Sequence, residues 1–377
     1  MPRPSFTLWV FILTFLVMSR QTLRADPNSC VSNTLKDSVA TPTVKQLGAS
    51  KNLYQLMRSN ALHYWGWAKK TAPSGVGAYL KHEGWVSGDP HPGNFAIIQV
   101  EGKLKLLPVD LDDAGRGPLV LDITKLLGML KVFNPELKAK QVTQSYLDGL
   151  AGKRIAFPEK YREFRDMTKT DYEAIVAEYV GKKQKNGKFK LKEGEIEAAT
   201  RTQKDKVKTL VSKAIPGAKI QDVAIRPVER GGSAGSLRFW ILIEEKGKQR
   251  ILELKTIQDS GLNAYVPQGE KGKHFQEAFD FFWEGKTDPH FQVVSLDGKP
   301  FFLREKKVDL YDSQELNKEM SYYLAYTLGR LHGRQPGGKA LLAQAARSET
   351  SQETFQDAVK ALAKSYLKEI ESVYDGD

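Results

Sequence analysis

The sequence contains one cysteine, Cys30, and six histidines scattered along 377 residues. A single cysteine excludes an intrachain disulfide, so disulfide bridges give no information about the redox compartment. The histidines show none of the spacings of a zinc site. The sequence also has no internal repeat and no Ser-His-Asp or Cys-His pattern. These absences exclude disulfide scaffolds, zinc-finger modules and the common nucleophilic triads.

The sequence also lacks an apolar run long enough to span a membrane. Residues 6–18 are apolar over thirteen positions, whereas a spanning helix needs about 20. With Ala25 as a small residue at a cleavage position, the run predicts an export signal and a periplasmic or secreted protein. A membrane anchor through residues 6–18 is the alternative. Arg20 and Arg24 on the far side of the run argue against export, and a misassigned start would leave the protein cytoplasmic.

Positive charge exceeds negative charge, with 57 Lys and Arg against 45 Asp and Glu and a net charge of +12. Such a surface attracts phosphates, nucleic acid or anionic lipid, but charge spread along the chain is also what a solvated surface shows. The densest stretch, residues 182–192, contains few aromatic residues. We therefore expect no dedicated nucleic-acid recognition.

The length favours two lobes rather than one compact core. The hydrophobic pattern is mainly helical up to a Pro-Gly pair near residue 216, then strand-like with period two, then helical again. This order predicts an α+β fold with five segments, which comprise a leader at 1–25, a linker at 26–44, a helical lobe at 45–216, a strand-rich lobe at 217–312 and C-terminal helices at 313–377.

The stretch VSGDPHPGNF at 86–95 is polar and rigid, and it is the first candidate site. Phosphoryl transfer needs a carboxylate that orients the acceptor hydroxyl and oxygen ligands for Mg²⁺. Asp89 suits the first role, whereas Asn94 and Asp110, which follows a predicted hairpin, suit the second. The alternative is a polar turn whose acids cap neighbouring elements.

The second half offers phosphate-binding residues in the order loop, strand, helix. Gly232 and Gly235 in ERGGSAGS can form a phosphate loop, Lys255 in ILELKTI can contact phosphates, and Glu277 can pair with that lysine. Each has a plainer interpretation, as a hairpin turn, a solvent-facing strand residue and a helix-surface acid. Glu270 lies near enough to replace Glu277.

SGDPHPGNF followed by PVDLDDAGRGPLVLDITKLL resembles the catalytic loop and metal-binding segment of the aminoglycoside phosphotransferase and choline kinase branch of the protein-kinase-like fold. The resemblance implies that Asp89 is catalytic, that Asn94 and Asp110 bind Mg²⁺ beside ATP, and that Asp122 braces the loop. It also implies that His91 is a structural element of that loop.

In that branch the nucleotide lobe precedes the catalytic loop, whereas here the candidate lobe follows it. YYLAYTLGRLHGRQ at 322–335 resembles the helix that leads directly into the catalytic loop, yet it lies near the C-terminus. The resemblance therefore implies a circularly permuted, two-lobe kinase-like fold. It has a helical catalytic lobe and a small strand-rich nucleotide lobe.

The arrangement also resembles a bacterial family of unassigned role, domain of unknown function 2252, from about residue 50 to near the C-terminus. MRSNALHYWG, FFLREKK and ALAKSYLKEIESVY carry this likeness. The chain differs from that family in its Gly-Gly-Ser-Ala-Gly stretch, in VDLDD and in the export-type leader.

Together these features predict a kinase-like phosphotransferase that moves the terminal phosphoryl group of ATP to a hydroxyl of an unidentified small-molecule acceptor. Asp89 would orient the acceptor, and Lys255, clamped by Glu277, would hold the phosphates. One alternative is an exported nucleotide-binding or inert pseudokinase that acts as a binding module. A metal-dependent phosphoesterase, which would have no use for Lys255, is another.

Overall fold

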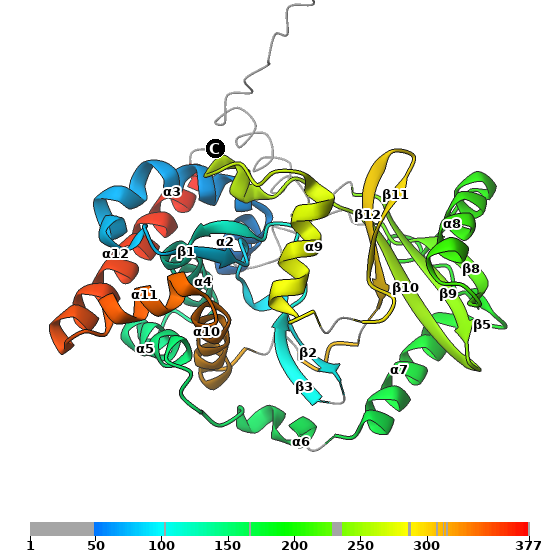
Figure 1. Ribbon diagram of the computed structural model, residues 1–377, viewed down its shortest axis with the longest axis horizontal. Helices are drawn as coiled ribbons and strands as arrows, with labels where there is room; N and C mark the ends of the chain where they lie inside the picture. Colours follow the sequence, from blue (N-terminus) through cyan, green and yellow to red (C-terminus); the bar gives the residue numbers. More distant parts are fainter. Residues whose placement is uncertain are drawn as a thin grey trace, which may run out of the picture.

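The computed structural model describes residues 49–101, 103–165, 167–227, 236–285, 288–306, 308–311, 313 and 316–375. The predicted leader at 1–25, the linker at 26–44, and Gly232 and Gly235 lie outside these residues. The described part is a mixed α+β structure with a helical half and a sheet half (Figure 1), as the coarse fold class predicted. Among the described helices, none has the length and apolar character needed to cross a membrane.

The helical half is built from segments at both ends of the chain. Its elements are α2 (Ala49–Ser59), α3 (Ala61–Val76), β1 (Glu83–Val86), β2 (Phe95–Val100), β3 (Lys103–Pro108), β4 (Gly115–Pro118), α4 (Leu119–Phe133), α5 (Ala139–Leu150), α10 (Lys318–Gly333), α11 (Pro336–Ala345) and α12 (Glu349–Asp375). Helix α4 is apolar almost all round and is buried almost throughout, as expected for a central helix. The C-terminal helices pack around it in one hydrophobic core.

Helices α5 and α10 cross at backbone contact, which glycine makes possible. A Cβ on Gly149 would lie 2.1 Å from the Tyr326 carbonyl oxygen, and one on Gly329 would lie 2.1 Å from that of Tyr146. No larger residue fits at either position. The crossing fixes α10, which comes late in the chain, against the first half of the sequence.

The sheet half holds one six-stranded antiparallel sheet in the order β11-β12-β10-β9-β8-β7. Its elements are β7 (Glu197–Ala198), β8 (Lys219–Ile225), β9 (Arg238–Glu245), β10 (Lys248–Thr256), β11 (Gln292–Leu296) and β12 (Lys299–Glu305), with helices α7 (Lys169–Lys183), α8 (Arg201–Ala214) and α9 (Lys271–Phe282). Two short elements, α6 (Arg162–Arg165) and the hairpin of β5 (Gln184–Lys185) with β6 (Lys188–Phe189), complete the connection from the helical half.

The sheet has one apolar face and one partly charged face. Leu252 and Leu254 of β10 pack in the core that α8 covers. Because side chains alternate along a strand, Glu253 and Lys255 lie on the opposite face, and both are buried. A second core on that face packs α7 against Ile251 and its neighbours. Helix α9 lies between the two halves in Figure 1, and its core cluster includes residues of both.

The change between the halves comes earlier in the chain than expected. Helices α7 and α8 and strand β7 fall within the predicted helical segment 45–216, but they pack on the sheet. The spacing of apolar residues shows which face of a helix is buried, but it does not show which other element packs against that face. The sequence pattern therefore predicts the boundary between the lobes at the Pro-Gly pair near residue 216. The hairpin predicted before Asp110 is confirmed as β2 and β3, and β11 and β12 form a second hairpin around Asp297 and Gly298. Asp297 and Gly298 both have positive φ, at 51° and 74°, as a two-residue hairpin turn requires.

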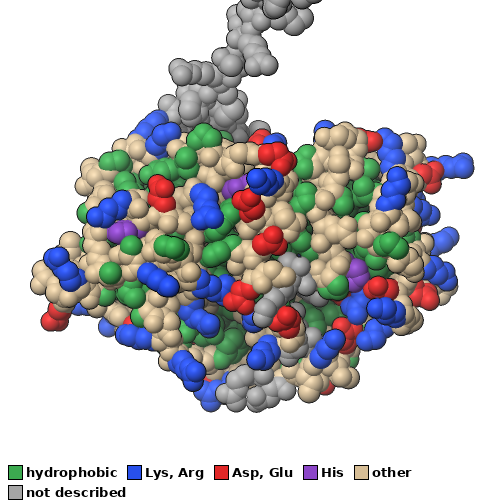
Figure 2. Space-filling model, in the orientation of Figure 1, with side chains coloured by type: hydrophobic (Ala, Val, Ile, Leu, Met, Phe, Trp, Pro, Cys, Tyr) green, Lys and Arg blue, Asp and Glu red, His purple; other side chains and the backbone are tan. Residues whose placement is uncertain are grey.

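Charged side chains are mixed on the surface. On the face drawn in Figure 2, Lys and Arg are spread over both halves among Asp and Glu rather than gathered in one patch. This distribution is the one that a solvated basic surface predicts.

Candidate functional site

Strand β1 leads into the loop at residues 86–95 through a glycine that no other residue could replace. Gly88 has a φ of +77°, and a Cβ there would lie 1.7 Å from the Asp113 carbonyl oxygen. Glycine is the residue that adopts this conformation without penalty. The close approach holds the residue before Asp89 against the segment that carries Asp110 to Asp113.

Asp122, at the start of α4, braces the loop as predicted. Its carboxylate accepts hydrogen bonds from the backbone N–H groups of Ser87 at 2.7 Å and Gly88 at 3.0 Å, and from the Ser87 hydroxyl at 3.1 Å. His332 Nε2, from α10, lies 3.2 Å from the same carboxylate. Asp122 and His332 are both fully buried. Asp122 therefore links the loop to both α4 and α10.

We expect Asp122→Ala to lower the free energy of unfolding by about 3 kcal/mol or more, because it leaves buried donors without an acceptor at about 1–3 kcal/mol each. Urea denaturation measures this loss. Asp205→Ala on the exposed side of α8 is the control and should change stability by less than about 0.5 kcal/mol. A loss at Asp122 as small as that of the control would contradict the bracing role.

Asp89 forms a buried ion pair that the sequence analysis missed. Lys125 Nζ lies 2.6 Å from Asp89 Oδ1, and the Lys125 side chain is fully buried. His91 Nε2 lies 3.4 Å from Asp89 Oδ2. Burial opposes ionisation of Asp89, but Lys125 and His91 outweigh it and lower the pKa of the carboxyl. Lys125 could have been noticed in the sequence, because it is a lysine within the apolar helix 119–133 and lies three residues after Asp122.

The β2–β3 hairpin brings Asn94 next to Asp110. Its register pairs Phe95 with Pro108, and the Val109 N–H donates to the Asn94 carbonyl at 2.9 Å. The Asn94 side-chain amide donates to the Asp89 carbonyl at 2.9 Å. Asn94 precedes the hairpin and Asp110 follows it, so the pairing of β2 with β3 brings their backbones close together.

Lys255 of β10 meets this segment from the sheet half. Its Nζ lies 3.2 Å from Asp110 Oδ1 and also forms an ion pair with Asp112 Oδ2. Burial disfavours the ammonium, but Asp110 and Asp112 outweigh burial and raise the pKa of Lys255. Burial and the neighbouring Asp110 raise the pKa of Asp112 to about 6. Lys255 therefore contacts Asp110 and Asp112, and the backbone bond from Val109 to Asn94 joins this segment to the loop that carries Asp89.

Two arginines beside Lys255 were not predicted. Arg238 lies opposite Lys255 in the sheet register, and Arg304 lies opposite Glu253. Arg304 donates to Glu253 Oε1 at 2.9 Å and to the Val109 carbonyl at 2.7 Å, and Arg238 lies 3.4 Å from Glu253 Oε2. Burial opposes ionisation of Glu253, but the arginines lower its pKa to about 2. The sheet thus presents three cations and one acid.

Glu277 is not part of this group. It lies on α9 with its side chain 51% exposed, and its nearest ion-pair partner is Lys273 at 3.9 Å. The expected clamp of Lys255 by Glu277 is not formed, because α9 turns Phe275, Phe279 and other apolar residues to the core and Glu277 to the outside. Asp110 and Asp112 supply the carboxylates instead.

The oxygen donors of this group suit a hard divalent cation such as Mg²⁺, which prefers carboxylate and amide oxygens. Asn94, Asp110 and Asp112 could hold it. Asp112 Oδ1 is buried and has no hydrogen-bond partner among the described residues. A buried carboxylate oxygen without a donor is the kind of atom that a cation satisfies.

Comparison with known proteins gives one family. The profile described as an uncharacterized protein conserved in bacteria (DUF2252) matches residues 151–376. The chain belongs to the DUF2252 family. No curated protein and no solved structure matches the chain. The part of this DUF2252 member that the family profile covers includes Lys255 and Arg304 but not the loop at 86–95.

Proposed function

We propose that this DUF2252 member is an ATP-dependent phosphotransferase with a circularly permuted, protein-kinase-like fold, which uses Mg²⁺ to phosphorylate a hydroxyl of a small-molecule acceptor. One observation carries the proposal. Lys255 reaches Asp110 across 145 residues of sequence, so the cation and the carboxylates that were predicted separately lie in contact. A phosphate-binding lysine beside a metal-binding carboxylate is the arrangement that phosphoryl transfer needs.

A contact at the end of α10 supports the permuted chain order. Gln335 follows α10 and exchanges two hydrogen bonds with the backbone of Trp85, at 2.5 and 2.9 Å. Trp85 lies just before the loop that carries Asp89. The helix that the kinase resemblance would join directly to the loop thus ends beside it.

In the proposed reaction the acceptor oxygen forms a bond to the terminal phosphorus of ATP, the bond from that phosphorus to the bridging oxygen breaks, and ADP leaves. Asp89 accepts a hydrogen bond from the acceptor hydroxyl and receives its proton. Because Lys125 lowers the pKa of Asp89, the carboxylate is a weak base that mainly orients the hydroxyl, which suits a loose transition state. Lys255, Arg238 and Arg304 offset the charge of the phosphates. Mg²⁺ bound at Asn94, Asp110 and Asp112 would neutralise the charge between phosphates.

The burial of Asp89 favours a second candidate, a nucleotide-binding pseudokinase. Asp89 is only 5% exposed, and Lys125 and His91 already contact its carboxylate. A protein of this kind would bind ATP through Lys255 and Asp110 without transferring phosphate. Turnover of ATP separates the two candidates, whereas binding of ATP does not.

We expect ATP with Mg²⁺ to raise the melting temperature of the protein, because a ligand at 100 times its Kd stabilises the folded state by about 2.7 kcal/mol. Asp110→Asn should weaken the Mg²⁺-dependent part of the ATP affinity at least about tenfold, since it removes one charged ligand. Thermal shift with ATP alone, with Mg²⁺ alone and with both measures this. A shift that is absent in the wild type, or unchanged in the variant, would contradict the site.

A further inference from the structure

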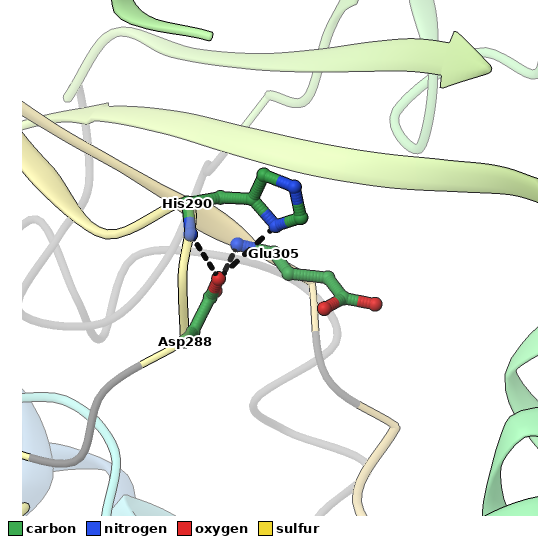
Figure 3. A group of neighbouring side chains, drawn as sticks. All are labelled: Asp288, His290 and Glu305. Atoms are coloured by element: carbon green, nitrogen blue, oxygen red, sulfur yellow. Dashed lines mark hydrogen bonds and ion pairs between the residues drawn. The ribbon is translucent and has the colours of Figure 1, made fainter. Parts of the chain in front are cut away.

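Three buried side chains outside the phosphotransfer site converge at one end of the sheet (Figure 3). They are Asp288, in the connection after α9, His290, just before β11, and Glu305, the last residue of β12. The side chains of Asp288 and His290 are 2% and 6% exposed, and that of Glu305 is 5% exposed. One ligand atom from each lies within 4.8 Å of the others.

The backbone fixes the Asp288 carboxylate in place. Its Oδ1 accepts a hydrogen bond from the His290 N–H at 2.7 Å, and its Oδ2 accepts one from the Glu305 N–H. Figure 3 shows both bonds. These donors orient one carboxylate oxygen toward the imidazole ring.

The imidazole of His290 lies between two carboxylates. Its Nε2 is 3.0 Å from Glu245 Oε2, and its Nδ1 is 3.2 Å from Asp288 Oδ1. Nδ1 is buried and makes no hydrogen bond of acceptable geometry with any described residue. A neutral imidazole carries one N–H, so when Nε2–H donates to Glu245 the lone pair of Nδ1 faces a carboxylate. In this tautomer, either a second proton or a cation lies between Nδ1 and the Asp288 carboxylate.

We propose that Asp288, His290 and Glu305 bind a divalent transition metal, Zn²⁺, through His290 Nδ1 and one oxygen of each acid. A metal-bound histidine usually donates its other N–H to a carboxylate, and Glu245 is placed to accept it. The mixed nitrogen and oxygen donors suit Zn²⁺ rather than Mg²⁺ or Ca²⁺. Zinc bonds of about 2.0–2.1 Å require the three donor atoms, which lie within 4.8 Å of one another, to move closer together when the metal binds.

The charges around the three ligands are of both signs. Glu173 and Glu245 add negative charge from α7 and β9, whereas Arg250 lies 2.5 Å from Glu305 Oε1 and offsets part of it. All of these residues line a cavity of about 610 Å³ that is open enough for water to complete the coordination. The metal would join the α9–β11 connection to the ends of β9 and β12. It would thus have a structural role, independent of the proposed phosphotransferase.

The test measures metal retained by the full chain after removal of any purification tag and dialysis against Zn²⁺. The wild type should hold about one Zn²⁺ more than His290→Gln, and Zn²⁺ should raise the melting temperature of the wild type but not of this variant. Glu245→Gln should weaken the Zn²⁺ affinity about 10–100-fold, as outer-shell changes do. His63→Gln, at a partly buried histidine near the single carboxylate of Glu369, and Asp110→Asn, in the other site, should both retain this Zn²⁺.

Three results would overturn the proposal. One is the absence of bound metal in the wild type at tenfold excess Zn²⁺ with no change in melting temperature, in which case a proton on Nδ1 lies between His290 and Asp288. Another is equal retention by His290→Gln. Loss of the ion in Asp110→Asn with retention in His290→Gln would also overturn it, because the ion would then belong to the phosphotransfer site.

Discussion

Replacing Asp89 by asparagine should lower ATP turnover about 10²–10⁴-fold, the range that a positioned proton acceptor contributes. Asparagine keeps the shape of the side chain but cannot receive the acceptor proton. The ATP affinity should stay within about threefold of the wild type, because an interaction used only in the transition state leaves ground-state binding unchanged. Release of ADP under saturating ATP and Mg²⁺ measures turnover, and calorimetry measures affinity.

The ion pair with Lys125 makes a further control necessary. Asp89→Asn leaves a fully buried ammonium without its carboxylate, and breaking a buried pair costs about 3–5 kcal/mol. The double variant Asp89→Asn, Lys125→Met removes both charges and should recover most of that stability without recovering activity. Full ATP turnover in either variant would eliminate Asp89 as the acceptor-orienting residue. Loss of activity that the double variant restores would show that Asp89 acts only through stability.

Lys255→Met should lower kcat/KM for ATP about 10²–10³-fold, as expected when one preorganised charge is removed from a phosphoryl-transfer site. Methionine preserves much of the side-chain volume, so the loss reflects charge. Without the ammonium, Asp110 and Asp112 face each other as like charges, and the pKa values of both should rise. The activity of the variant should therefore fall further at low pH, where these carboxyls take up protons and can no longer bind metal.

Lys248→Met is the matched control for Lys255→Met. Lys248 lies on the same strand, is 61% exposed and pairs with Glu173, so its loss should change kcat/KM less than about twofold. If Lys255→Met retains activity while Asp110→Asn does not, a metal-dependent phosphoesterase explains the carboxylates better than a kinase-like enzyme.

The sequence was most informative where local chemistry is unusual. VSGDPHPGNF singles out Asp89 and Asn94 as candidates because two prolines and two glycines within ten residues have few roles other than a rigid loop. The hairpin after it could be predicted from period-two runs, and its register places Asn94 beside Asp110. Lys255 was visible as a lysine within an apolar strand.

The remaining site residues depend on packing between distant elements. Arg238 and Arg304 join the group because β9 and β12 flank β10 in the sheet. The pairing of β10 with β12 cannot be predicted from the sequence of either strand by itself. Only the order of loop, strand and helix points to Glu277, and the orientation of α9 places that side chain on the surface. Asp288, His290 and Glu305 have no recognisable spacing, since the tertiary fold brings them together.

The most direct test of the account is a crystal structure with a non-hydrolysable ATP analogue and Mn²⁺, which is visible by its anomalous signal. The account predicts the metal on Asp110 with Asn94 or Asp112 as a further ligand, a phosphate oxygen within hydrogen-bond distance of Lys255, and the terminal phosphate facing Asp89. A nucleotide bound elsewhere, with Lys255 still paired only to Asp110 and Asp112, would contradict it.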